Sequence, residues 1–230
     1  MKVALVLLFA ATAIAHDRIS TKVTWDREIA AIVQARCISC HVAGGKGPMP
    51  LTSYEEARPW ARAIKEEVLT RRMPKWHVVR GYGDFKNDPT LSPFEIGLIA
   101  AWADGGAPKV SAGKGSAPVS QPSRGLPAVE DLAAASRARS VSVPCSSPVL
   151  PTGRMLGLSP VVERGAAVRL TLRTADGLEE PLLWIRNFDP KFAETYWLRN
   201  PLTLAKGARM SATFSGPCRI NVLLSPGTAP

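Results

Sequence analysis

Cys37-Ile38-Ser39-Cys40-His41 is the stretch that determines how the amino-terminal half of this chain is interpreted. Its C-x-x-C-H spacing is the attachment signature of a c-type haem. Two thiols at this spacing can bond the two vinyl groups of one haem, and the imidazole that follows them can then bind the iron. The motif therefore predicts one covalently attached haem c, with Cys37 and Cys40 as its thioether anchors and His41 as the proximal axial ligand.

Two other chemistries also use closely spaced cysteines. A thioredoxin-type dithiol lies where a strand runs into a helix within a βαβ pattern, but no strand-like run precedes Cys37. A zinc site needs a second pair of Cys or His ligands, and the next cysteine in the chain is Cys145. Haem attachment is the interpretation that agrees best with this context.

The amino terminus has the pattern of an export signal. Met1-Lys2 precedes an apolar run over residues 3–11, and Ala13-Ile14-Ala15 matches the small-x-small cleavage pattern. The run is too short to cross a bilayer. We expect a signal peptide over residues 1–15, cleaved or kept as an anchor, and a periplasmic or otherwise exported protein without a stable membrane span after cleavage. Haem is joined to c-type cytochromes after export, so the two predictions support each other.

Composition divides the remainder into two domains. Residues 110–141 are rich in Ser, Ala, Gly, Pro and Arg, and such a stretch buries too little apolar surface to offset the entropy lost on ordering. We therefore predict a haem domain over residues 16–109, a linker over residues 110–141 and a second domain over residues 142–230.

Charge and the remaining cysteines constrain partners and stability. The formal net charge of +10 suits redox partner proteins with acidic surfaces, and an exported protein is not expected to bind nucleic acid. Cys145 and Cys218 are left once the haem pair is assigned. In an oxidising compartment such a pair commonly forms a disulfide. Closing a loop of about 70 residues contributes roughly 4 kcal/mol of stability from chain entropy.

Periodicity predicts three helices in the haem domain. The first covers about residues 26–35. The second begins at the capping box Ser53-Tyr54-Glu55-Glu56, where Pro59 either kinks the helix or belongs to its first turn. The third begins at Ser92-Pro93-Phe94-Glu95 and stops at Gly105. This is the helix order of a class I-type cytochrome c.

Two segments of the haem domain carry a family resemblance. They are Met73-Pro74-Lys75-Trp76-His77 and Gly81-Tyr82-Gly83-Asp84-Phe85-Lys86-Asn87-Asp88. Residues 22–108 resemble the small cytochrome c domains of exported bacterial proteins that carry Met-Pro-x-Trp-His followed by Gly-Tyr-Gly-x-Phe-x-Asn-Asp. The resemblance implies an all-α, class I-like monohaem cytochrome c domain. It makes Trp76 and His77 candidates for the haem pocket.

The sixth iron ligand determines the redox behaviour. Met73 lies on a loop that can cross the face opposite His41, and we predict it as the distal ligand, with His77 and Met49 as the alternatives. Pro48 matches the position where cytochromes c place a proline whose carbonyl accepts the Nδ1 hydrogen of the proximal histidine. That arrangement puts Met49 on the proximal side. A His/Met pair raises the reduction potential relative to two histidines.

The second domain reads as strands. Val168-Arg169-Leu170-Thr171-Leu172-Arg173 alternates apolar and polar residues, and further strands are expected at residues 181–185, 209–214 and 219–224. Short strands separated by turn residues predict an all-β antiparallel sandwich. The whole chain is thus expected to be multi-domain, with an all-α cytochrome c domain ahead of the sandwich.

Four segments of this domain carry a second resemblance: Asp176 to Asp189, Thr195-Tyr196, Asn200-Pro201-Leu202, and Lys206 to Arg209. They resemble the carboxy-terminal half of type II copper, ascorbate-dependent monooxygenases of the peptidylglycine-hydroxylating kind. Bacterial members of that family can carry such a cytochrome c domain ahead of it. The other half of a two-domain monooxygenase is absent from this sequence.

The second domain departs from that family at the copper ligands. The family's copper needs imidazoles, including a His-x-His on an early strand, and the matching stretch here is Gly153-Arg154-Met155-Leu156-Gly157. The histidines of the chain are His16, His41 and His77, so no His-rich copper site can form in this domain. We expect no copper and a degenerate sandwich.

Three functions are compatible with these features. The first is a periplasmic electron carrier with a His/Met-ligated haem, whose sandwich docks a partner. The second is the electron-feeding domain of a monooxygenase-like enzyme or complex. The third is a haem-based sensor of redox state or of a diatomic gas, which needs an open or labile sixth position. Because no acid, base or nucleophile stands out, a carrier rather than a catalyst is the preferred interpretation.

Overall fold

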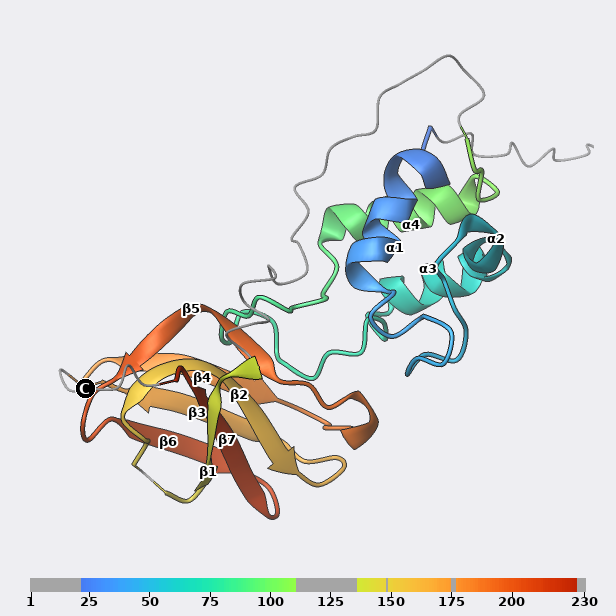
Figure 1. The fold of residues 1–230 in the computed structure, drawn as a ribbon. Coiled ribbons are helices and arrows are strands. Elements are labelled where there is room, and N and C mark those ends of the chain that lie inside the picture. The colour runs from blue at the N-terminus through green and yellow to red at the C-terminus, as the bar shows by residue number, and fades with distance from the viewer. Residues whose placement is uncertain (1–21, 111–135, 148, 175–176, 227–230) are drawn as a thin grey trace, which may run out of the picture.

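The computed structural model describes residues 22–110, 136–147, 149–174 and 177–226. They form a β-rich region with two antiparallel sheets and a part built from short helices (Figure 1). The predicted signal peptide lies outside the described residues, as does most of the predicted linker. In the described ranges no helix is long and apolar enough to span a membrane.

The helical part follows the predicted order. In chain order its elements are η1 (Trp25–Ile29), α1 (Ala30–Arg36), α2 (Tyr54–Ala57), η2 (Arg58–Trp60), α3 (Ala61–Leu69) and α4 (Pro93–Asp104). Both predicted capping boxes are present, since Ser53 and Ser92 each accept a hydrogen bond from the backbone three residues later. Pro59 lies in η2, the 3-10 step between α2 and α3, which is where a residue without an N–H interrupts a regular helix.

The helical part has its own small core. Trp102 of α4 is fully buried and donates a hydrogen bond from Nε1 to the Pro108 carbonyl at 3.0 Å. The buried side chain of Arg36, the last residue of α1, donates to the Glu95 carboxylate at 3.0 Å. Burial raises the pKa of Glu95, but the hydrogen bonds from Ser92 and Arg36 outweigh it, so this pKa lies below its usual value. The ion pair joins the end of α1 to the start of α4.

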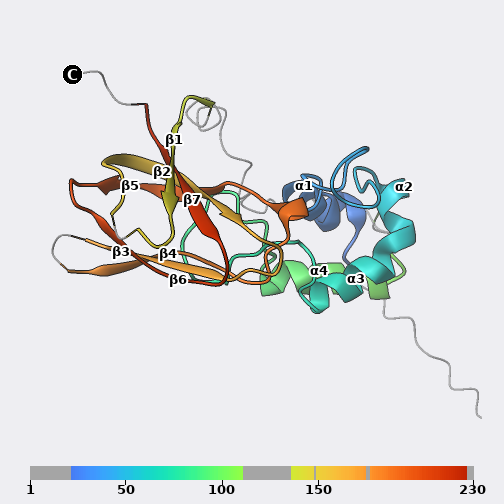
Figure 2. The same cartoon turned by 90° about the horizontal axis from the view of Figure 1, so that it is seen from below.

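Two antiparallel sheets form the β-rich region. The strands are β1 (Arg139–Pro144), β2 (Gly153–Val162), β3 (Val168–Arg173), β4 (Glu179–Ile185), β5 (Tyr196–Leu204), β6 (Arg209–Phe214) and β7 (Cys218–Leu224). One sheet has the order β1-β7-β2-β5 and the other β4-β3-β6. Figure 2 shows them as two layers with the helical part at one end. This is the sandwich-like arrangement of antiparallel sheets that the alternation predicted.

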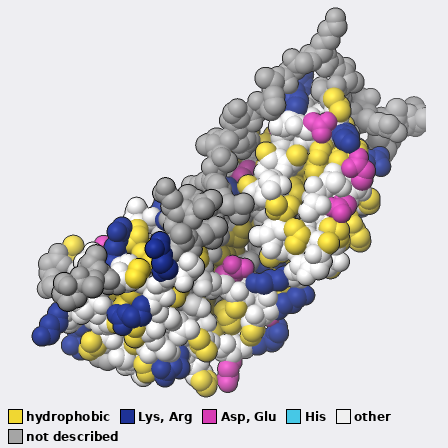
Figure 3. Space-filling model, viewed as in Figure 1, with side chains coloured by type: hydrophobic (Ala, Val, Ile, Leu, Met, Phe, Trp, Pro, Cys, Tyr) yellow, Lys and Arg dark blue, Asp and Glu magenta, His cyan; other side chains and the backbone are white. Residues whose placement is uncertain are grey.

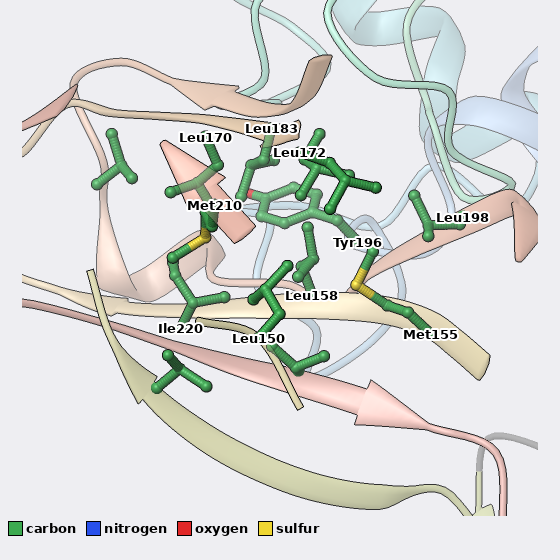
Figure 4. Close-up of a cluster of buried hydrophobic side chains, with 14 of the residues drawn as sticks. Leu150, Met155, Leu158, Leu170, Leu172, Leu183, Tyr196, Leu198, Met210 and Ile220 are labelled. Atoms are coloured by element: carbon green, nitrogen blue, oxygen red, sulfur yellow. The ribbon is translucent and has the colours of Figure 1, made fainter. Parts of the chain in front are cut away.

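The core of the sandwich lies between these layers. Met155 and Met210 point into a cluster of leucines around Tyr196 (Figure 4) and are at most 5% exposed. They are therefore packing residues in this structure. Cys145 and Cys218 form a disulfide with a Cα–Cα distance of 5.4 Å. The predicted disulfide is thus confirmed, and it joins the end of β1 to the start of β7.

Periodicity missed β1, β2 and β5. Pro160 lies in β2. The pairing of β2 with β5 ends at Leu158, so on the β5 side no strand is present to accept the hydrogen bond that Pro160, which has no N–H, cannot donate. β5 is an edge strand, which tolerates Pro201 for the same reason. β1 begins at Arg139, inside the predicted linker. β2 and β5 were therefore missed because each contains a proline, a residue that usually ends a strand. β1 was missed because it begins in a region with the composition of a linker.

Residues 76–87, which we call the joint segment, close one side of the sandwich although they belong to the predicted haem domain. Val78 pairs with Ile185 beside β4, and Phe85 pairs with Leu198 beside β5. β4 and β5 are edge strands of the two different sheets. Val78 and Phe85 are buried in the sandwich core. The joint segment therefore covers an edge of each sheet and adds to the core between them.

Candidate haem-attachment site

The C-x-x-C-H motif begins at the carboxyl end of α1. Cys37 is the C-cap residue and donates its N–H to the Val33 carbonyl at 2.8 Å. Cys40 and His41 both donate backbone hydrogen bonds back to the Cys37 carbonyl. The helix therefore passes directly into a tight turn that holds the three chemically distinctive side chains close together in sequence and in space.

Both cysteines of the motif are free thiols and partly exposed. Burial raises the pKa of the Cys37 thiol to about 12, so the neutral thiol is its stable form at physiological pH. The thiols are not joined to each other. Each can thus form a bond to a separate group, which is what attachment through two thioethers requires.

The ring of His41 is held by a backbone carbonyl. Its Nδ1 lies 2.9 Å from the Met49 carbonyl oxygen. Because a carbonyl can only accept, Nδ1 carries the hydrogen, and in the neutral ring Nε2 keeps its lone pair. The prediction that the Pro48 carbonyl takes this role is wrong by one residue. The Leu51 N–H donates a hydrogen bond to the His41 carbonyl and so closes the loop between the two residues. In this loop the carbonyl of Met49, not that of Pro48, lies beside the His41 ring.

Gly47 supports the same ring from its face. A Cβ at this position would lie 2.7 Å from His41 Nδ1 and 2.9 Å from Cγ and Cε1. Real side chains do not approach a ring so closely. The backbone at position 47 can therefore pack against the His41 ring only because the residue is glycine. The Gly47 N–H donates to the Cys40 carbonyl at 2.8 Å, and this hydrogen bond holds Gly47 against the C-x-x-C-H motif.

The three candidates for the sixth ligand have different surroundings. Met49 is partly buried and packs against the helical core. His77 accepts a hydrogen bond at Nε2 from the Asp189 N–H at 3.1 Å, and its ring lies 5.0 Å from that of Phe188. Met73 is partly exposed and belongs to neither core cluster. Its N–H donates to the Glu67 carbonyl, which attaches it to the end of α3.

Trp76 and His77, the candidates for the haem pocket, contact the sandwich. The Trp76 ring lies 5.0 Å from Tyr196 and 6.2 Å from Phe85. The His77 carbonyl accepts a hydrogen bond from the Arg186 N–H. Burial lowers the pKa of His77, and the nearby Asp189 carboxylate raises it. The effect of burial is the larger of the two, so this pKa lies below its usual value. Whether either side chain also borders a haem stays a prediction.

The motif Gly81 to Asp88 has a structural role that sequence reasoning missed. Asp84 accepts from Arg199 Nε at 2.9 Å. Asn87 donates to the Thr195 carbonyl and accepts from the Trp197 N–H. A Cβ on Gly83, at φ +82°, would lie 2.6 Å from the Leu182 carbonyl. The available signal was the density of aromatic residues in a loop, since a solvated loop does not need them.

One contact joins the attachment loop to the sandwich directly. Lys46 Nζ lies 3.3 Å from the Glu194 carboxylate and 3.3 Å from the Ala193 carbonyl. Both partners lie between the 3-10 turn η3 (Pro190–Phe192) and β5. The ion pair is exposed and contributes little to stability. It nevertheless places the segment before β5 beside the loop that follows His41.

The donor set fits a covalently attached haem. Two separate thiols and an imidazole with Nε2 available are present, and the core of the helical part has partly exposed apolar side chains at its border, among them Ile38, Met49, Ile64 and Leu98. Hydrophobic side chains also gather over the helical part on the face shown in Figure 3. Among the residues that the structure describes, no group of three or more His, Cys, Asp or Glu is arranged to hold a bare metal ion.

Comparison with known proteins adds no identification. No protein-family model matches this chain, and no curated protein or solved structure matches it either.

Proposed function

We propose that this chain is an exported c-type cytochrome that carries single electrons on one covalently attached haem. The observation that carries the proposal is the state of His41, whose Nδ1 is bonded to the Met49 carbonyl while Nε2 stays available, next to two free thiols. When bound, the haem supplies reversible one-electron exchange at its iron. Cys37 and Cys40 hold it covalently, and His41 Nε2 is the proximal ligand.

The surrounding residues have supporting roles in this proposal. The Met49 carbonyl fixes the tautomer and the orientation of the imidazole, so that Nε2 is the nitrogen left to bind the iron. The buried Arg36–Glu95 pair holds the end of α1, and with it Cys37, against α4. An interaction of this kind leaves an unpaired buried charge if one partner is removed. The attachment site thus stands on a fixed support, which suits a carrier whose ligands must not change during electron transfer.

We further propose Met73 as the second axial ligand. The side chain of His77 already accepts a hydrogen bond at Nε2, and Met49 is tied to the proximal side by its carbonyl and its packing. Met73 is the candidate whose side chain is committed to neither core. His/Met ligation favours a closed, six-coordinate electron carrier over a sensor that binds gases at an open position.

The ligand assignment is tested by spectroscopy and redox titration of matched variants. Ferric Met–haem coordination gives a charge-transfer band at the red end of the visible spectrum. Met73→Ala is expected to remove this band and to lower the reduction potential, whereas Met49→Ala keeps the band. Survival of the band in Met73→Ala, or rapid binding of carbon monoxide to the ferrous wild-type protein, would contradict a closed His/Met carrier.

A further inference from the structure

The outer face of the three-stranded sheet carries three arginines that we call the arginine face: Arg169, Arg173 and Arg209. Arg169 and Arg173 lie four residues apart on β3, with Thr171 between them, on the side of the strand opposite its buried residues. Arg209 of β6 is the direct cross-strand partner of Arg173. All three side chains are exposed. Like charges directly opposite each other destabilise a sheet, so sheet stability does not explain their position.

Negative charge near this face comes from the start of β4. Glu179 is the cross-strand neighbour of Arg173, and Glu180 follows it and is also exposed, so the three arginines outnumber these two carboxylates. In the ranges that the structure describes, no ion pair involves any residue of the arginine face. Some other arginines of the sandwich do form ion pairs, as Arg199 does with Asp84 and Arg164 with Asp189. The arginine face therefore retains positive charge that an external anion can neutralise.

Arg169 is held in place by aromatic rings. Its guanidinium lies 5.2 Å from the centre of the Tyr82 ring and 5.3 Å from that of Trp184. Its Nε donates to the Tyr82 hydroxyl at 3.0 Å, and that hydroxyl also bonds the Thr171 hydroxyl at 2.8 Å. Cation–π contacts of this kind restrain a guanidinium without neutralising its charge.

The restrained guanidinium still has donors to offer. Among the described residues, neither Nη atom of Arg169 has a hydrogen-bond partner. A planar fork with both Nη groups available matches the geometry of a carboxylate, which it can bind with two parallel hydrogen bonds. Because Tyr82 and Trp184 already fix its orientation, little side-chain entropy is lost when such a ligand binds.

We propose that the arginine face binds an extended acidic segment of a partner protein. One carboxylate pairs with Arg169, and a second lies between Arg173 and Arg209, where it relieves their mutual repulsion. Arg169 and Arg173 are separated by about 13 Å along the strand, which is the span of four residues of an extended chain. The partly exposed Trp184 and the exposed Pro181 offer apolar contact beside these charges. This interaction goes beyond electron transfer and needs no haem.

The test uses the full chain and a fluorescein-labelled peptide of alternating Glu and Ser residues, with binding followed by anisotropy at low ionic strength. Arg169→Gln is expected to weaken binding about tenfold, the cost of one charge-assisted hydrogen-bonded pair. Arg219→Gln is the matched control, because Arg219 is exposed on the outer face of the other sheet and bonds Ser142. It is expected to weaken binding less than twofold.

A second variant distinguishes a loss of binding from a folding defect caused by the change at Arg169. The double variant Arg173→Gln/Arg209→Gln leaves the contact with Tyr82 intact and is expected to weaken peptide binding by a similar factor. Equal losses in Arg219→Gln and in these variants, or no binding by the wild-type chain, would overturn the proposal. So would Arg169-dependent sedimentation with phosphatidylserine vesicles in place of peptide binding, since the face would then be a membrane surface.

Discussion

The helical part and the sandwich use their cysteines in opposite ways. In the sandwich, Cys145 is buried and bonded to Cys218, and the backbone of the two residues is also hydrogen-bonded. In the helical part, Cys37 and Cys40 remain separate and partly exposed beside His41. Cys218 is partly exposed, as Cys37 and Cys40 are, so the difference lies in bonding rather than in exposure: the pair that stabilises the fold is joined to itself, whereas the pair suited to chemistry keeps two separate thiols.

The two parts also differ in where their cores come from. Among the described residues, those of the helical core all come from the helical part, whereas the sandwich core includes Val78 and Phe85 from the joint segment. The sandwich is therefore completed by a stretch of sequence that precedes it by about fifty residues, across the predicted linker. Stability of the sandwich should depend on that stretch, and the predictions below test this in order of expected effect.

Phe85→Ala should cause the largest loss of stability, roughly 3–5 kcal/mol, because it removes a buried aromatic ring from the sandwich core. Phe85 is 3% exposed. Chemical denaturation of the full chain measures the effect. Phe94→Ala in α4 is the control, since Phe94 is 64% exposed, and its effect should stay within about 0.5 kcal/mol. Equal effects of the two changes would mean that the joint segment does not belong to the core.

Replacing both Cys145 and Cys218 by serine should lower the free energy of unfolding by about 2–4 kcal/mol, because the unfolded chain gains the freedom of a loop with a sequence separation of 73. Denaturant midpoints of the oxidised wild type and the double variant provide the comparison. A variant as stable as the wild type would show that the disulfide does not constrain the sandwich.

Gly47→Ala should disturb the helical part locally. The new Cβ would meet the His41 ring at 2.7 Å, so the ring must move and its hydrogen bond to Met49 weakens, at a cost of about 1–3 kcal/mol. In the haem-loaded protein this should appear as a shifted reduction potential. Gly97→Ala is the control, because no atom lies within 4 Å of a Cβ at that position. A potential shifted equally by both changes would argue against the role of Gly47.

Acidification should loosen the contact between the joint segment and the sandwich. Burial lowers the pKa of His77 below the usual histidine value of about 6.5 in spite of the carboxylates of Asp189 and Glu194. As the pH falls, His77 therefore takes up a proton in the unfolded state before it does so in the folded state. Its contribution to the free energy of unfolding is fully present above about pH 6.5 and is lost as the pH falls through the pKa of the folded state. Amide hydrogen exchange at Asp189 follows this opening.

The matched variant for this pH dependence is His77→Gln. The glutamine oxygen can accept the hydrogen bond from the Asp189 N–H but does not titrate. Exchange at Asp189 should then no longer accelerate between neutral and mildly acidic pH. If the acceleration persists in the variant, another group controls the opening.

Tyr196→Phe should have the smallest effect. Tyr196 is fully buried, and within the described residues its hydroxyl has no hydrogen-bond partner. Removing an unsatisfied buried hydroxyl should leave stability unchanged or raise it by up to about 1 kcal/mol. Tyr54→Phe in the helical part should instead cost about 1 kcal/mol, because Tyr54 donates to the Ala107 carbonyl at 2.9 Å. Thermal melts of the pair distinguish the two cases; a loss at Tyr196 would indicate a partner for its hydroxyl.

Local signals predicted much of the fold. The capping boxes at Ser53 and Ser92 and the period of β3 depend on residues that specify their own neighbourhood. The disulfide between Cys145 and Cys218 is not local, and it was predictable because these two cysteines remain once the haem pair is assigned. β2 and β5 were missed because Pro160 and Pro201 are tolerated only where no neighbouring strand needs their N–H. That condition depends on sheet order, which local sequence does not contain.

The candidate site was predictable to a similar extent. The C-x-x-C-H motif identifies Cys37, Cys40 and His41 by spacing alone, but the carbonyl that meets His41 depends on the path of the loop, and the prediction missed it by one residue. Trp76 and Phe85 were interpreted only as haem-domain residues, since the aromatic residues of their segment indicate burial but not contact with strands more than a hundred residues later. Long-range contacts of this kind are where periodicity and motifs stop being informative.

The central claim is that Cys37 and Cys40 hold a haem covalently. The most direct measurement is a pyridine haemochrome of the full chain, produced with a cytochrome c maturation system and extracted with acidic acetone, alongside a Cys37→Ser/Cys40→Ser variant. We predict that haem stays with the wild-type protein after extraction, with a spectrum showing both vinyl groups saturated, and that the variant retains none. Haem that is fully extracted from the wild type, or a wild type that carries none, would contradict the account.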